Sequence, residues 1–92
     1  MHSIHLYNNL RLEAEKHGKK ARLVLAEGEV EKACRKETAS RLYSFIKSAD
    51  GLIFKGRLQL HKQGSNITIL FKGEPVGVIS DESFINIINA LD

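Results

Sequence analysis

The sequence is poor in the residues and runs on which several protein classes depend. It contains one cysteine, Cys34, which excludes an internal disulfide framework and favours a reducing, cytoplasmic compartment. No run approaches the roughly 18 apolar residues of a membrane-spanning helix. Residues 1–12 mix His, Asn and Arg with apolar residues, so we expect no signal peptide. The sequence therefore predicts a cytoplasmic protein that does not interact with membranes.

Signatures of metal, cofactor and catalytic chemistry are also missing. The four histidines are scattered, and a single cysteine cannot complete the usual ligand set of a structural zinc site. The acidic residues fall at turns and expected helix starts, not in an apolar cleft that would separate the pKa values of two carboxylates. The glycines are explained by turns, so no phosphate-binding loop is indicated. We therefore expect no catalytic residue, no metal, no cofactor and no enzymatic activity.

The clearest pattern lies in residues 52–79, which we interpret as a three-stranded antiparallel meander over 52–60, 66–72 and 75–79. Its two turns are predicted at Gln63-Gly64 and Gly73-Glu74, where glycine allows a positive φ. Since side chains alternate along a strand, both turns select the same inner face. That face contains Phe54, Leu58, Leu60, Ile67, Ile69, Phe71, Val76 and Val78. Pro75 cannot donate to a ladder, so its strand should be an edge strand.

The opposite face of this meander is predicted to be basic. It would contain Lys55, Arg57, Gln59, His61, Asn66, Thr68, Leu70, Lys72 and Ile79. Lys55 and Lys72 would lie opposite each other, and like charges in that position disfavour strand pairing. Two interpretations follow: a solvated face with splayed lysines, or a platform that contacts an anionic partner.

Apolar spacing predicts three helices, over residues 4–16, 29–48 and 81–91. Cys34 falls on the apolar stripe of the second helix, which indicates a small buried hydrophobic residue and not a nucleophile. Residues 21–26 are too short to decide between strand and helix. We favour a short fourth strand added to an open edge of the meander, with a helical hairpin in the first half as the alternative.

These elements predict a small α+β domain with two layers, in which one side of the sheet is covered by helices. The chain of 92 residues has length for one core, so residues 1–92 are expected to form a single domain.

Two functions are compatible with this pattern. The first is a protein-binding module, such as an adaptor, regulator or inhibitor, because the predicted sheet face exposes Leu70 and Ile79 and leaves a strand edge open. The second is sequence-nonspecific binding of nucleic acid. It would use the sheet face residues Lys55, Arg57, His61 and Lys72 together with the basic loop residues Lys16, Lys19, Lys20 and Arg22. Arg35, Lys36 and Arg41 could extend either group.

The formal net charge of +3 is modest for a dedicated nucleic-acid-binding protein, which favours a protein partner. The predicted outer face also lacks aromatic residues, so single-stranded bases would have no platform on which to stack. A homodimer formed through an edge strand is compatible with both functions.

Overall fold

A computed structural model describes residues 2–91, and within them the chain forms two four-stranded antiparallel sheets and two helices. Sheet A contains β1 (His2–His5), β2 (Leu10–His17), β3 (Lys20–Glu27) and β4 (Val30–Thr38), and α1 (Ala39–Lys47) follows it. Sheet B contains β5 (Asp50–Ile53), β6 (Leu58–Gln63), β7 (Asn66–Phe71) and β8 (Glu74–Ser80), and α2 (Asp81–Asn89) follows it. In each sheet every strand pairs with its neighbour in sequence. The chain therefore repeats one unit of four strands and a helix.

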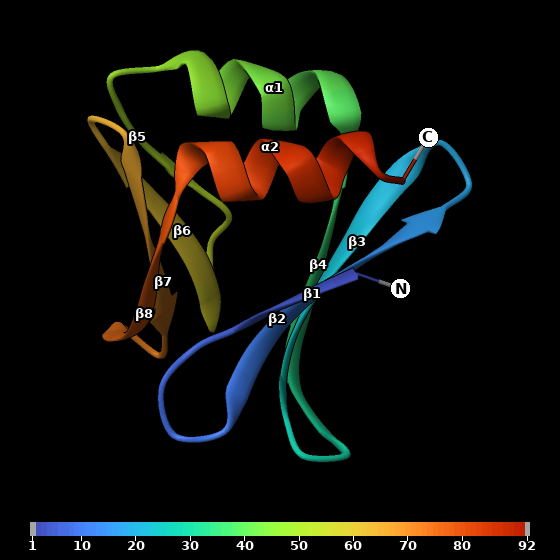
Figure 1. Cartoon of the computed structure of the whole chain (residues 1–92), viewed down its shortest axis with the longest axis vertical. Helices are drawn as coiled ribbons and strands as arrows, with labels where there is room; N and C mark the ends of the chain where they lie inside the picture. The colour runs from blue at the N-terminus through green and yellow to red at the C-terminus, as the bar shows by residue number, and fades with distance from the viewer. Residues whose placement is uncertain (1, 92) are drawn as a thin grey trace.

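The two sheets stand at an angle to each other, and both helices lie side by side across one end of them (Figure 1). The core lies between these layers. Leu12 and Leu25 from sheet A and Leu60 and Ile69 from sheet B are fully buried in one apolar cluster with helix residues of both units. The helices meet through Phe45 and Phe84, whose rings pack edge to face with centroids 6.4 Å apart. Each unit thus provides part of the cover for the other.

The predicted α+β fold with a single three-stranded meander is wrong, and the chain is mostly β. Residues 4–16, predicted as a helix, form the end of β1, the turn that follows it and nearly all of β2. The spacing of Ile4, Tyr7, Leu10 and Ala14 suits a helix, but residues 10–15 also alternate. Leu12 and Ala14 are buried, whereas the charged residues that alternate with them, Arg11, Glu13 and Glu15, are only partly buried. Pairing of β2 with strands on both sides stabilises the extended form, which local spacing cannot reveal.

The predicted helix over residues 29–48 is half strand. Residues Val30–Thr38 form β4, and the helix begins only at Ala39, where the Thr38 side chain accepts a hydrogen bond from the Arg41 amide. Cys34 is consequently exposed on β4, contrary to the predicted burial in a helix. Residues 21–26 do form a strand, β3, but it lies between β2 and β4 and not at an edge of the meander. The helix predicted over 81–91 is present as α2.

The predicted first strand of the meander, 52–60, is two strands. β5 and β6 pair antiparallel, and the chain reverses through residues 54–57, where Phe54 and Gly56 have φ angles of 73° and 92°. The next turn lies at Gly64-Ser65, one residue later than predicted, because Gln63 pairs with Asn66. Each residue of β6 therefore pairs with a β7 residue two positions further along the chain than predicted. Because side chains alternate with a period of two, the predicted inner face of β6 and β7 is retained.

A bulge changes which face of β8 is inside. The register shifts between Ile69 and Leu70, so that Ile69 pairs with Gly77 and Ile67 with Ile79. Ile79 is therefore 7% exposed and Val78 is 51% exposed, the reverse of the prediction. β8 lies at one end of sheet B, as expected for the strand that contains Pro75.

The two sheets approach each other closely along β8. Gly77 lies against Leu6, and a Cβ atom at position 77 would be only 2.7 Å from a Leu6 Cδ atom. The glycine thus allows the segment after β1 to pack directly on the backbone of β8. The end strands on the other side of the sheets, β4 and β5, are not joined to each other in a ladder.

Candidate nucleic-acid interface

The predicted basic face of sheet B does not exist. Lys55 and Arg57 lie in the loop between β5 and β6, and Lys72 lies in the turn between β7 and β8. The Lys72 amide donates a hydrogen bond to the Arg57 carbonyl oxygen at 2.8 Å, so these two residues adjoin at the end of the sheet. The Lys72 ammonium is 5.3 Å from the centre of the Phe71 ring. The prediction failed because it extended the strands through residues that form the loop and the turn.

His61 and Leu70 are the predicted site residues that do lie on the outer face of sheet B. His61 is held by Asp50, whose carboxylate oxygen is 3.0 Å from the His61 Nε2 atom. Leu70 is partly buried on the neighbouring strand. The predicted neighbour Ile79 is inside, and Val78 is exposed in its place. The outer face of sheet B therefore carries a mixture of apolar and uncharged polar side chains, and His61 is the only predicted basic site residue on it.

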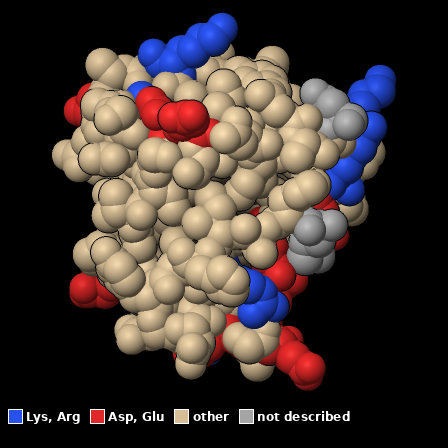
Figure 2. Space-filling model, in the orientation of Figure 1, with Lys and Arg blue, Asp and Glu red and all other residues tan. Residues whose placement is uncertain are grey.

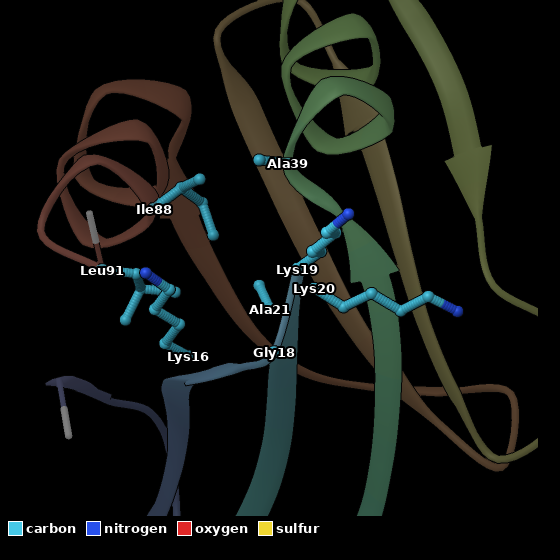
Figure 3. A pocket seen from close by; sticks show the side chains of 8 residues that line it. All are labelled: Lys16, Gly18, Lys19, Lys20, Ala21, Ala39, Ile88 and Leu91. Carbon is cyan, nitrogen blue, oxygen red and sulfur yellow. The ribbon is translucent and has the colours of Figure 1, made fainter.

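The basic loop is present but is divided between two surfaces. Lys16, Lys19 and Lys20 line a cavity of about 240 Å³ between the β2–β3 turn and α2, where Ile88 and Leu91 form its apolar side. Figure 3 shows Lys16 extending toward Leu91 and Lys19 toward α1, whereas Lys20 points away from α2. Lysine side chains therefore gather at this end of sheet A, but not all of them face the same cavity.

Arg22, predicted as part of the same loop, lies on the outer face of sheet A. Its guanidinium donates hydrogen bonds to Glu31 and Glu15, and these contacts raise its pKa above the ordinary value. Arg11 forms a further ion pair with Glu13 on the same sheet. These arginines are thus neutralised by carboxylates of their own sheet and offer little to an anionic partner.

A groove between β4 and β5 gathers basic residues that are far apart in the sequence. Its volume is about 350 Å³, and it is lined by Arg35, Lys36, Glu37, Arg41, Leu52, Ile53, Phe54 and Lys55. Arg35 pairs with Leu23 across β3 and β4, which directs it to the inner side of the sheet. Its guanidinium carbon is 5.6 Å from the centre of the Phe54 ring.

The groove is positively charged, since four of its lining residues are basic and one is acidic. In the register of β3 and β4, Lys36 pairs with Arg22 and so borders the groove from the outer side of the sheet, opposite to the side of Arg35. Glu37 is 3.7 Å from Arg41 and also accepts a hydrogen bond from the Thr38 amide, so this acid belongs to the start of α1. Lys36 and Lys55 form no ion pair with another residue in the described range 2–91. A phosphate in the groove would therefore meet several positive charges at short range.

Further basic residues continue this charge at both ends of the groove. Lys20 pairs with Thr38 in the register of β3 and β4, which places it on the outer side of the sheet with Lys36 and Arg22, opposite to the side of Arg35. At the other end, Lys55 is followed by Arg57 and its neighbour Lys72. The side of the molecule shown in Figure 2, by contrast, is mostly uncharged across its middle.

The sequence showed that Arg35, Lys36 and Arg41 are basic and close together, but not where they lie. The predicted helix over 29–48 places all three on its polar face, whereas in the structure Arg35 and Lys36 lie on opposite sides of β4 and Arg41 lies near the start of α1. No sequence pattern indicates that β5, the first strand of the second unit, lies next to β4.

Other kinds of site find no support in the described part of the chain. No group of three or more His, Cys, Asp or Glu residues in 2–91 could hold a metal ion. In the same range, neither helix has the length and apolar character required to cross a bilayer. No protein-family model, curated protein or solved structure matches the chain.

Proposed function

We propose that the protein binds nucleic acid through the groove between β4 and β5, by contacts with the phosphate backbone and without sequence preference. The observation that supports this proposal is the gathering of Arg35, Lys36, Arg41 and Lys55 around one groove. Residues from two strands, a helix and a loop converge there, although the net charge of the chain is only +3. A local concentration of positive charge attracts a polyanion more effectively than the average charge suggests.

The groove favours backbone contact over recognition of bases. Phe54 is the one aromatic residue that lines it, and the Arg35 guanidinium lies over the Phe54 ring. Stacking of several bases would need further exposed rings on the same surface. The outer face of sheet B also lacks the basic residues that would hold a strand across it. We therefore expect affinity to depend on charge and salt and to vary little with sequence.

A fluorescence titration with labelled duplex DNA, duplex RNA and single strands tests this proposal. If four basic residues contact phosphates, the logarithm of the affinity should fall with the logarithm of the salt concentration with a slope of about 3 to 4. The triple variant Lys36→Glu, Arg41→Glu, Lys55→Glu should bind at least 30-fold more weakly at low salt. Lys47→Glu, an exposed charge reversal outside the groove, is the matched control and should have a small effect.

Two results would contradict the proposal. One is the absence of binding by the unchanged protein at low salt. The other is equal loss of affinity in the Lys47→Glu control and in the triple variant, which would indicate a general charge effect and not a site.

A protein-binding function, in which the protein acts as an adaptor, regulator or inhibitor, is the second candidate. It is favoured by the outer face of sheet B, where Leu52 is 58% and Val78 51% exposed. A protein partner bound there should be recovered with the unchanged protein and lost with Val78→Lys. Neither function includes a catalytic step or a cofactor. The exposed thiol of Cys34 suits the reducing cytoplasm, which we retain as the proposed location.

A further inference from the structure

The outer face of sheet B has an arrangement of side chains that is symmetric across its four strands. In the register of the sheet, Leu52 pairs with His61, His61 with Thr68 and Thr68 with Val78. One row across the sheet thus reads apolar, polar, polar, apolar. Its two apolar ends are both more than half exposed. A neighbouring row contains Gln59, Leu70 and Pro75, which are also uncharged.

We propose that this face binds the same face of a second copy of the chain, to form a two-fold symmetric dimer. A two-fold axis that runs along the strands, between β6 and β7, places β5 of each copy over β8 of the other. It then brings Leu52 of one copy onto Val78 of its partner, and the reverse contact forms at the same time. Contacts of this reciprocal kind define an isologous interface.

Charge distribution favours a second copy as the occupant. A chain with a net charge of +3 repels its own copies, except where the contacting surface carries no excess charge. On this face the acidic residue Asp50 lies against His61, and the remaining residues of both rows are neutral. A partner of opposite charge would instead be recognised through complementary charges, and the face offers none. The outer face of sheet A, with its ion pairs, does not share these properties.

The size of the face predicts a weak dimer. Four strands spaced about 4.8 Å apart, with about six residues each, cover roughly 20 by 20 Å. This area, on the order of 400 Å² on each copy, is about half of what a stable interface buries on each partner. We therefore expect dissociation in the range of tens to hundreds of micromolar. The inference rests on sheet B; Leu52 also lines the groove, whereas Val78 does not, so Val78 variants separate the dimer from nucleic-acid binding.

Sedimentation equilibrium between about 10 µM and 1 mM tests the dimer. The mass should rise with concentration from 10.3 kDa toward twice that value. Val78→Lys should weaken association at least tenfold. Val30→Lys, at a valine that is 57% exposed on sheet A, is the matched control and should leave association unchanged. A mass of one chain at every concentration would overturn the inference, as would equal weakening by the control.

A mixing experiment tests the predicted pairing of Leu52 with Val78. The Leu52→Glu and Val78→Lys variants should each be monomeric, because each places two buried charges in its own dimer. Mixed together, they should form a heterodimer in which one contact is an ion pair and the other remains Leu on Val. A mixture that associates no better than either variant alone, with circular dichroism showing both folded, would exclude this geometry. The groove variants should leave the mass unaffected, which separates this result from the nucleic-acid titration.

Discussion

Lys62 is a charged residue buried in the core side of sheet B, with only 3% of its surface exposed. Its ammonium donates hydrogen bonds of 2.6 Å to the carbonyl oxygens of Ser48 and Gly64, and it lies 3.8 Å from an Asp81 carboxylate oxygen. These partners belong to the end of α1, the β6–β7 turn and the start of α2. One side chain therefore connects three segments, which are also joined by backbone hydrogen bonds from the Gly64 amide to Ala49 and from the Asp81 amide to Ser65.

We predict that Lys62→Met lowers the free energy of unfolding by about 2–4 kcal/mol. The methionine fills a similar volume, but it leaves two partly buried carbonyl groups and a carboxylate without their donor. Urea unfolding followed by circular dichroism measures the change. Lys47→Met, at an exposed lysine, is the control and should change stability by less than about 0.5 kcal/mol. An equally small effect at Lys62 would show that water replaces the ammonium.

Gly77→Ala should destabilise the protein by about 1–2 kcal/mol, because the added methyl group overlaps the Leu6 side chain. Thermal unfolding measures the loss. The combination with Leu6→Ala should cost less than the sum of the two single changes, since the smaller residue makes room for the methyl group. Additive costs would indicate that the two segments do not depend on each other.

At the scale of elements, the two helices start in the same way. Ser80 accepts a hydrogen bond from the Ser83 amide at 3.0 Å, and Thr38 accepts one from the Arg41 amide at 3.4 Å. Counted from these caps, Leu42 and Phe84 occupy the same position, and both are fully buried. Each helix is therefore fixed by one capping side chain and one large apolar residue in its first turns.

Ser80→Ala should lower stability by about 1 kcal/mol, and Thr38→Ala by somewhat less, since its hydrogen bond is longer. Chemical unfolding of both variants measures the difference. Ser40→Ala, at an exposed position inside α1, provides a control that does not change a cap. A smaller loss at position 80 than at position 40 would rule out capping as the cause.

The elements that the sequence predicted are those whose signals are local. α2 has a capping serine, two acids and a regular apolar face, and β7 has a run of branched residues between two turns. The helix predicted over residues 29–48 is wrong in its first half because Thr38 fits the middle of an apolar helical stripe as well as it fits an N-cap. The bulge between β7 and β8 has no signature of its own in these residues. The sequence therefore predicts Val78 on the inner face and Ile79 on the outer face, the reverse of the structure.

The candidate site was less predictable than the fold. Its basic residues are visible in the sequence, but the groove exists only because two end strands from different units lie on either side of it. A prediction that assigned β4 to a helix could not place Arg35 beside Phe54. The outer face of sheet B was misjudged for a simpler reason, since Lys55, Arg57 and Lys72 lie just outside the strands.

At the scale of the whole molecule, neither unit can complete the core alone. Buried residues from both sheets and both helices form one cluster, and each sheet would expose its inner face without the other unit. We predict that fragments 1–48 and 49–92 are unfolded when separate and regain β structure when mixed. Circular dichroism of each fragment and of the equimolar mixture decides the point. A separately folded fragment with cooperative thermal unfolding would contradict it.

The repeated unit also determines how differently the two outer faces can behave. In an assembly of identical single units, symmetry would force every surface to occur twice with the same residues. Because both units belong to one polypeptide, each outer face has acquired a chemistry of its own: arginine–glutamate pairs on sheet A and neutral residues on sheet B. One outer face can therefore be neutral while the other carries ion pairs, which two identical units could not combine.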